Sequence, residues 1–389
     1  MRKLTIVFHH AGGGHRSAAD ALKETLSKQA QPWDVTLLDT QELLDPLDLI
    51  RRATGVRIQD TYNLILRKGW TRFSAQLLVV LKATIRIYHS PIVKLFRTYW
   101  AEHPADLVLS VIPHFNREIA ESLRAGDAGT KTPFVTLITD LADYPPHFWI
   151  ERESEFIIAG TERARQQALT LGLPADHVFL TSGMILKPKF YEKVGGDRVA
   201  ERKLLGLEPD CPTGVVLFGG HGSQVMVEIA KNLDQAAGGV QLIMICGHNE
   251  KLAAELRNLR TKKPIAVVGF VKNVEHYMAL ADFFIGKPGP GSISEALQFH
   301  LPVIVECNSS TLPQERYNAE WVTEKGYGIV VPSFTKIVPA VQRLLERETF
   351  REFRRNAGGY SNRALSEVPV ILEQCAKRTA TPVEAQTAV

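Results

Sequence analysis

The sequence has few cysteines, and they show no pairing pattern. Only four occur in 389 residues, at positions 211, 246, 307 and 375, without a C-x-x-C pair. This spacing gives neither a disulfide framework nor a zinc site, which is typical of a protein in a reducing cytoplasm. Long apolar runs are lacking too, since residues 77–81 end at Lys82, far short of the roughly 20 residues that span a bilayer. A strand is expected almost at the N-terminus, so we expect no signal peptide.

Neither sign of charge dominates overall, because the net charge is only +4. The distribution is uneven, however: residues 50–100 hold ten basic residues and a single acidic one, Asp60. Positive charge confined to one aromatic-rich stretch disfavours nucleic acid as a partner. It fits either a solvated helix face or contact with an anionic membrane surface. The residues expected at such a surface are Trp70, Arg72, Phe73, Lys82, Arg86 and Lys94.

Apolar, strand-like runs alternate with helix-period segments along most of the chain. The runs predicted as strands are 5–8, 34–38, 107–112, 134–138, 156–159, 215–218, 241–246, 265–268, 283–285 and 302–305. This alternation favours the α/β class, with doubly wound parallel sheets and helices on both faces.

The length of the chain favours two domains, because 389 residues exceed what one hydrophobic core usually supports. We expect an N-terminal domain over residues 1–190 and a C-terminal domain over 205–345, with the linker between 181 and 206. C-terminal helices over 346–378 could pack back on the N-terminal domain, and residues 379–389 would form a frayed tail.

Two glycine-rich turns each follow an apolar run and open a helix. The first contains Gly13, Gly14 and His15, and the second runs from Gly219 to Ser223. Glycine lets backbone N–H groups approach a ligand, and a helix N-terminus favours an anion. Each turn alone is equally compatible with a tight βα turn that binds nothing. Together they suggest two similar halves facing one cleft.

The most specific segment is 283–297, where a strand ends in a Pro/Gly turn and a helix opens near Ser292. Free N–H groups at Gly291, Ser292 and Ile293 would face an anion. Glu295 lies about one turn further on, where a carboxylate can accept hydrogen bonds from ribose hydroxyls. The alternative is that Glu295 only stabilises the helix N-terminus.

At these motifs the chain resembles the GT-B glycosyltransferases that include monogalactosyldiacylglycerol synthases and processive diacylglycerol glucosyltransferases. More distantly it resembles the peptidoglycan lipid-intermediate GlcNAc transferase. The resemblance runs from Ile6 to about Val331, and is carried by residues 12–18, Thr139-Asp140 with His147 and Trp149, 246–249, 269–271, 287–297, and 313–315 with Asn318. It implies two Rossmann-like domains facing a cleft. The implied reaction moves galactose or glucose, with inversion, from UDP-galactose or UDP-glucose to a diacylglycerol-type lipid. The enzyme would be peripheral, at the cytoplasmic face of a membrane.

The resemblance also implies that the C-terminal domain holds the UDP-sugar. The backbone of Phe270 and Val271 would meet uracil, the helix start would bind the diphosphate, and Glu295 would bind the ribose. Gln314 and Glu315 would contact sugar hydroxyls. The full donor set is Gly220, His221, Ser223, Phe270, Val271, Lys287, Gly291, Ser292, Ile293, Glu295, Gln314, Glu315 and Asn318. No metal or other cofactor is implied, because no tight Asp-x-Asp occurs and the helix N-terminus supplies a positive field.

The acceptor would be a lipid hydroxyl bound near Gly13, Gly14, His147 and Trp149. Inverting transfer needs a base for the hydroxyl proton. Plant-type galactolipid synthases carry Ser-Asp-Thr where this chain has His9-His10-Ala11, so the base position falls on His10, and an imidazole suits that role near neutral pH. The rival is His15, because the distant peptidoglycan relative places a histidine there, and Asp140 is the nearest alternative carboxylate.

Three other functions stay open. The chain could be a GlcNAc transferase acting on a polyprenyl or lipid-A-like acceptor, a UDP-sugar epimerase without a lipid, or a non-enzymatic protein that binds anionic lipid. The basic aromatic stretch speaks against the epimerase. A pure binding protein would leave residues 287–297 and 313–318 without a role.

Overall fold

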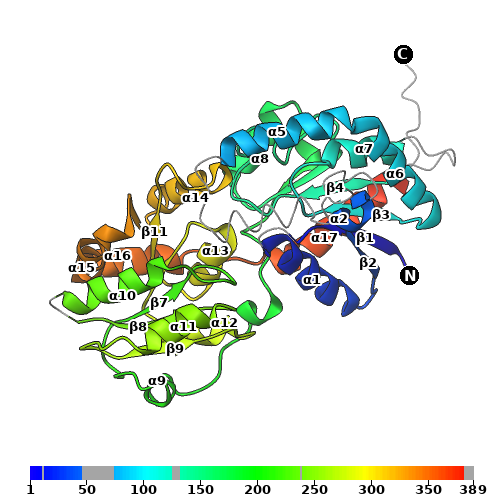
Figure 1. The fold of residues 1–389 in the computed structure, drawn as a ribbon. Coiled ribbons are helices and arrows are strands. Elements are labelled where there is room, and N and C mark those ends of the chain that lie inside the picture. The colour runs from blue at the N-terminus through cyan, green and yellow to red at the C-terminus, as the bar shows by residue number, and fades with distance from the viewer. Residues whose placement is uncertain (11–12, 46–73, 125–131, 237–238, 381–389) are drawn as a thin grey trace. The chain divides into compact units, whose positions relative to one another are not determined.

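The computed structural model describes residues 1–10, 13–45, 74–124, 132–236 and 239–380. The chain forms two compact units (Figure 1). Unit 1 comprises residues 1–187 together with the segment from Arg363 onward, and unit 2 comprises residues 188–362. The C-terminal helices of the sequence therefore divide between the units. Helix α16 (Arg347–Gly358) belongs to unit 2, whereas α17 (Ala364–Ala380) belongs to unit 1 and contacts α1 (Gly14–Ser27).

Unit 1 contains a parallel sheet in the order β2-β1-β3-β4-β5-β6. Its strands are β1 (Lys3–Phe8), β2 (Asp34–Asp39), β3 (Leu107–Ser110), β4 (Phe134–Leu137), β5 (Phe156–Ala159) and β6 (Val178–Leu180). Every residue of β3, β4 and β5 is buried, as expected for central parallel strands covered on both faces. The flanking elements, besides α1 and α17, are α2 (Thr40–Leu44), α5 (Ser74–Ile87), α6 (His89–Glu102), α7 (Asn116–Arg124), α8 (Glu162–Thr170) and the 3-10 turn η3 (Ala175–His177).

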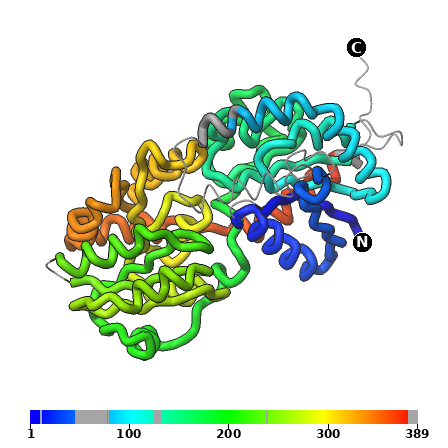
Figure 2. The backbone as a smooth tube through the Cα atoms, viewed as in Figure 1, coloured from blue at the N-terminus to red at the C-terminus, as the bar shows by residue number. Residues whose placement is uncertain are grey.

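Unit 2 contains a second parallel sheet, in the order β12-β11-β10-β7-β8-β9. Its strands are β7 (Thr213–Leu217), β8 (Gln241–Ile245), β9 (Ile265–Val268), β10 (Phe283–Gly286), β11 (Val303–Glu306) and β12 (Gly328–Val331). The remaining elements, followed by colour in Figure 2, are η4 (Pro188–Tyr191), α9 (Arg198–Leu204), α10 (Val225–Gln235), α11 (Glu250–Arg257), α12 (Val274–Leu280), α13 (Pro290–Gln298), α14 (Pro313–Glu324), η5 (Phe334–Lys336) and α15 (Ile337–Leu345).

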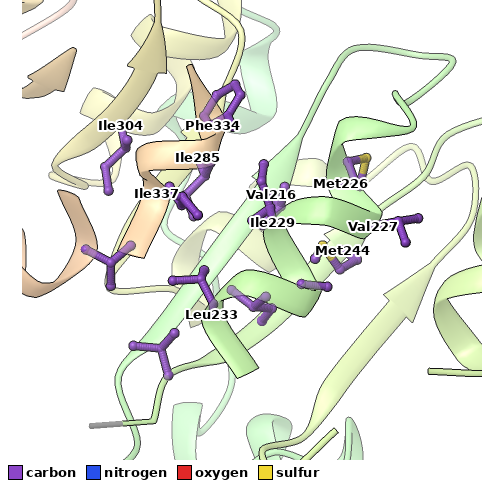
Figure 3. Close-up of a cluster of buried hydrophobic side chains, with 14 of the residues drawn as sticks. Val216, Met226, Val227, Ile229, Leu233, Met244, Ile285, Ile304, Phe334 and Ile337 are labelled. Atoms are coloured by element: carbon purple, nitrogen blue, oxygen red, sulfur yellow. The ribbon is translucent and has the colours of Figure 1, made fainter. Parts of the chain in front are cut away.

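An apolar core holds the central strands of unit 2 in place. Strand side chains pack there against α10, η5 and α15, as Figure 3 shows for Val216, Met226, Ile229, Leu233, Met244, Ile285, Ile304, Phe334 and Ile337. Burial of each such side chain contributes about 1.5–3 kcal/mol. This core therefore fixes the ends of β7 and β10, from which the site loops leave.

The order of strands reverses once in each sheet. In unit 1 the chain adds β2 on one side of β1 and then β3 on the other, and in unit 2 it places β10 beside β7 after adding β8 and β9. In doubly wound sheets, ligands bind at the carboxyl ends of the strands at such a reversal. The loops after β1 and β3, and those after β7 and β10, are therefore the places to look for a site.

Candidate active site

The loops after β7 and β10 meet beside the start of α14. A Cβ atom built on Gly219 would lie 3.9 Å from the Cε atom of Lys287. The Lys287 ammonium lies 3.5 Å from a carboxylate oxygen of Glu315, whose side chain is only 12% exposed. Lys287 itself is 44% exposed. A solvent-accessible cation is thus held at the reversal point of the unit 2 sheet.

The glycine loop after β7 is fixed by the loop after β8. The N–H of His248 donates to the Gly220 carbonyl at 2.9 Å, and the Asn249 amide donates to the His221 carbonyl at 3.2 Å. Gly247 has φ of 59°, and a Cβ there would lie 2.2 Å from the Gly220 oxygen, so only glycine fits. These bonds explain why the sequence places Gly247, His248 and Asn249 together after β8.

Helix α13 begins at Pro290, two residues earlier than expected, with Gly289 as its N-cap residue. The N–H of Ile293 donates to the Gly289 carbonyl at 3.1 Å, so the expectation of a free donor at Ile293 is wrong. Pro290 has no N–H, and the first turn leaves the N–H groups of Gly291 and Ser292 without helical partners. No acidic residue lies in that first turn to occupy them. Glu295 lies half-buried about one turn further on.

Helix α14 is hydrogen-bonded to the turn after β10 and carries two buried amide oxygens beside that turn. Asn318 is fully buried, and its amide donates to the Pro288 carbonyl at 2.7 Å. The amide oxygens of Asn318 and Gln314 are both buried without a hydrogen-bond partner among the residues that the structure describes. Buried acceptors in folded proteins are nearly always paired, so a bound water or a ligand group is expected to supply the donor that these two oxygens lack.

An aromatic pair lies after β8 and β9. The rings of His248 and Phe270 stack with centroids 3.9 Å apart and planes 18° apart. Phe270 is 52% exposed, which is unusual for a large apolar side chain. The stacked pair exposes a flat aromatic surface to solvent. It lies beside the glycine loop, because the ring centroid of His221 is 6.0 Å from that of His248.

In unit 1, His15 joins the carboxyl ends of β1, β3 and β4. Its Nδ1 atom lies 2.9 Å from the Val111 carbonyl oxygen and 3.0 Å from the Thr139 hydroxyl. Burial lowers the pKa of His15 to about 4, so the ring is neutral at pH 7.

Two further histidines surround His15, and both are neutral. The ring centroid of His9 lies 4.5 Å from that of His15, and burial, followed by the nearby imidazoles, lowers the pKa of His9 well below its usual value. Burial, followed by the charge of Lys82, lowers the pKa of His114 to about 3. The sequence analysis did not single out His9 or His114, because only the strand order brings them together.

His10 has a different environment. Its side chain is 54% exposed, its ring lies edge-on to Phe8, and its Nε2 atom lies 3.5 Å from an oxygen of the Asp39 carboxylate. Asp39 ends β2 and also accepts a bond from the Gln41 N–H at the start of α2. Sequence analysis missed Asp39, because only the pairing of β1 with β2 places it beside His10.

Asp140 and Asp143 shape the loop after β4. The Asp140 carboxylate accepts a hydrogen bond of 2.8 Å from the indole N–H of Trp149, and the Trp149 ring lies 5.6 Å from that of His15. Asp143, which sequence analysis missed, accepts bonds from the N–H groups of three successive residues beginning at His147. His147 has φ of 60°, a conformation that this carboxylate helps to hold.

The expected membrane residues are only partly described. Trp70, Arg72 and Phe73 lie outside the described residues. The Lys82 ammonium donates to the Pro146 carbonyl at 2.9 Å, so Lys82 supports the loop that carries His147. Arg86 and Lys94 are exposed, as are the apolar residues Val80 and Ile87 of α5. None of the helices that the structure describes is long and apolar enough to span a bilayer.

Residues 214–360 match the Glycosyltransferase family 28 C-terminal domain. The chain is 28% identical over 343 residues to monogalactosyldiacylglycerol synthase 1 of Arabidopsis thaliana, covering 84% of this chain and 62% of the relative. It is also 28% identical over 358 residues to the probable monogalactosyldiacylglycerol synthase of Nicotiana tabacum, covering 87% of this chain and 64% of the relative. The chain thus spans less than two thirds of the length of these two relatives.

Solved structures share the fold at low sequence identity. Acinetobacter baumannii MurG superposes with a TM-score of 0.64 and 14% identity, covering 96% of this chain and 100% of that one. The UDP-GlcNAc 2-epimerase of Neisseria meningitidis bound to UDP-GlcNAc superposes with a TM-score of 0.58 and 14% identity, covering 96% of this chain and 99% of that one. The MnaA–UDP complex of Staphylococcus aureus superposes with a TM-score of 0.62 and 13% identity, covering 97% of this chain and 98% of that one. These similarities confirm the expected doubly wound architecture.

Proposed function

We propose that this chain, which has the GT-B fold and matches the family 28 glycosyltransferase C-terminal domain over residues 214–360, transfers galactose or glucose from a UDP-sugar to diacylglycerol or a related membrane lipid, with inversion. One observation carries the proposal. At the reversal point of the unit 2 sheet, Lys287 and the open start of α13 lie beside the unpaired buried oxygens of Gln314 and Asn318. A cationic, donor-rich end next to acceptors suits a sugar nucleotide.

The donor would bind with its diphosphate at the start of α13. The N–H groups of Gly291 and Ser292, together with the Lys287 ammonium, supply a positive field for the phosphates. Glu295 would accept bonds from the ribose, and Phe270 with Val271 would meet the uracil. The oxygens of Gln314 and Asn318, with Glu315, would accept bonds from sugar hydroxyls. Solved structures with this fold that contain UDP or UDP-GlcNAc support a UDP-sugar as the donor.

In the reaction, the acceptor oxygen would attack the anomeric carbon while the bond from that carbon to the UDP oxygen breaks. UDP then carries the additional negative charge. Donors already directed at the phosphates stabilise that charge as it develops. Lys287 and the α13 N–H groups would do this, and no proton needs to reach UDP.

His10 is proposed as the base that takes the hydroxyl proton. Its Nε2 faces Asp39, so Nδ1 is the nitrogen available to the acceptor. A carboxylate beside an imidazole orients the ring and stabilises the imidazolium that forms. His15 is less suited, because a pKa of about 4 makes it a weak proton acceptor at neutral pH.

Three imidazoles on the acceptor side are uncharged, which is compatible with a neutral hydroxyl as the acceptor group. Burial holds His9, His15 and His114 neutral, so these rings offer no charge to a phosphate. The names of the two plant relatives support diacylglycerol as the acceptor. We further propose that the exposed basic and apolar residues of α5 and α6 bind the cytoplasmic face of an anionic membrane, as in a peripheral enzyme.

The decisive experiment offers the purified protein UDP-galactose, UDP-glucose and UDP-GlcNAc, each with vesicles that contain diacylglycerol. Mass spectrometry should identify a hexosyl-diacylglycerol, and the anomeric coupling in its proton NMR spectrum should show inversion. Transfer of GlcNAc to an added polyprenyl lipid instead would overturn the proposed acceptor and sugar. Conversion of the UDP-sugar to an epimer without lipid would overturn the transferase proposal.

A further inference from the structure

We propose that Thr139 is a positioning residue, which with the Val111 carbonyl holds His15 in the tautomer that carries its proton on Nδ1. The Nε2 lone pair is then free to accept a hydrogen bond from the acceptor hydroxyl. The tautomer assignment stands on the geometry of unit 1 alone. The role toward the acceptor rests on the function proposed above.

The tautomer follows from the two contacts of Nδ1. A carbonyl oxygen can only accept, so the 2.9 Å contact with Val111 requires a proton on Nδ1. The ring carries only one proton, because burial keeps it neutral at pH 7. Which nitrogen carries the proton is set by the bond that this nitrogen makes. Nε2 is therefore unprotonated.

Thr139 supplies the second oxygen in front of Nδ1, at 3.0 Å. It stands just after β4, whereas Val111 follows β3 and His15 opens α1, so the ring is held across three separate elements. The rings of His9 and Trp149, with centroids 4.5 and 5.6 Å from that of His15, limit its rotation. Without the Thr139 oxygen, a single acceptor would oppose a change of tautomer or a ring flip.

The tautomer matters because it decides whether Nε2 accepts a hydrogen bond from the acceptor hydroxyl or donates one to it. A proton on Nε2 would make that nitrogen a donor, which leaves the hydroxyl proton without an acceptor there. With the proton on Nδ1, Nε2 accepts from the hydroxyl and orients its oxygen without removing the proton. Because the hydroxyl has a single proton, it would donate to Nε2 of His15 on binding and then turn toward Nδ1 of His10, which takes the proton as the oxygen attacks, so the two histidines would have separate roles.

The test measures the tautomer directly by long-range ¹H–¹⁵N NMR of the whole protein labelled with ¹⁵N-histidine, with His15→Gln to assign the signals. Wild type should show the Nδ1–H pattern at His15. Thr139→Val should show a measurable fraction of Nε2–H and about tenfold lower kcat with little change in KM, as expected for the loss of one neutral hydrogen bond. Thr139→Ser, which keeps the hydroxyl, should restore both.

Thr136→Val is the matched control. Thr136 is a fully buried residue of β4, and its hydroxyl has no partner among the described residues, so its loss should change neither the spectrum nor kcat. If Thr139→Val does not fold, the wild-type spectrum and Thr139→Ser still test the assignment. An Nε2–H pattern in wild type, or an unchanged pattern in folded Thr139→Val, overturns the proposal. Because the spectra need no substrate, a protein with the expected tautomer but no transferase activity refutes only the proposed function.

Discussion

The His10 imidazole lies 3.5 Å from the Asp39 carboxylate, although helix α1 separates the two residues along the chain, with His10 just after β1 and Asp39 at the end of β2. His10→Ala should lower turnover about 10²–10⁴-fold, the usual scale for one general base, while the Kd of UDP stays unchanged. His15→Ala should lower turnover less. The opposite ranking of the two variants would assign the base to His15.

Asp39→Asn tests the contribution of the carboxylate to the pair of His10 and Asp39. Asparagine can still cap α2 but carries no charge, so turnover should fall about 10- to 100-fold without loss of folding. The matched control is Asp34→Asn, at the exposed first residue of the same strand, which should behave as wild type. Equal activity of both variants would remove Asp39 from the mechanism.

Glu295→Ala should weaken UDP binding by about 1.5–3 kcal/mol, the scale for hydrogen bonds to a charged group. Isothermal titration with UDP gives the Kd, and the melting temperature checks folding. Glu320→Ala, at an exposed position of α14, is the control. An unaltered Kd in Glu295→Ala would refute the ribose assignment.

Lys287→Met should weaken binding of UDP far more than binding of uridine, because the ammonium would contact only the diphosphate. The expected loss for UDP is about tenfold or more, and the salt dependence of its Kd should decrease. Lys231→Met changes an exposed lysine of α10 and controls for net charge. Equal losses for UDP and uridine would place Lys287 away from the phosphates.

His89 should make stability depend on pH. Its two ring nitrogens lie 2.8 Å from the carboxylates of Glu118 and Glu121, and these bonds, that to Glu118 foremost, raise the pKa of His89 in the folded protein. A raised pKa stabilises the fold below the unfolded value of about 6.5, and the gain is lost as pH rises through the folded value. His89→Gln should therefore reduce the free energy of unfolding at pH 5.5, by about 1.5–3 kcal/mol, more than at pH 9.

Urea titrations at the two pH values measure this difference. His103→Gln, at the exposed end of the same helix α6, provides the control and should show no such dependence. If His89→Gln is destabilised equally at both pH values, the ion pairs of His89 with Glu118 and Glu121 do not stabilise the fold.

Replacing Arg86, Lys94 and Arg97 by Gln should weaken binding to anionic vesicles by up to about 1 kcal/mol per residue at low salt. The three side chains are exposed, and Lys82 is left intact because it supports the loop at Pro146. Flotation in low and high salt measures the effect, with Lys231→Gln as the control. Unchanged flotation of the triple variant would show that these residues form a solvated face.

Each run predicted as a strand from the sequence coincides with a strand of the structure, because buried parallel strands are continuously apolar. The two strands not predicted, β6 and β12, are edge strands of only three and four residues, and so short an apolar run cannot be told from a helix segment by its pattern alone. At the candidate site, the sequence could not predict whether the Ile293 N–H is free. The motif indicates that Ile293 lies near a phosphate, but its N–H is free only if the helix starts later than Pro290. Asp39 and Asp143 act through contacts that only the folded chain creates.

The pairing of α1 with α17 makes unit 2 an insertion within unit 1. Glu367 of α17 accepts a bond of 2.7 Å from the Ser182 N–H, and Arg378 pairs with Asp176, so the last helix is held by residues some 200 positions earlier. During synthesis from the N-terminus, unit 1 lacks this helix until α17 has been made, after the whole of unit 2. Unit 2, complete at residue 362, can mature first. The unit that begins first would therefore be the last to finish folding.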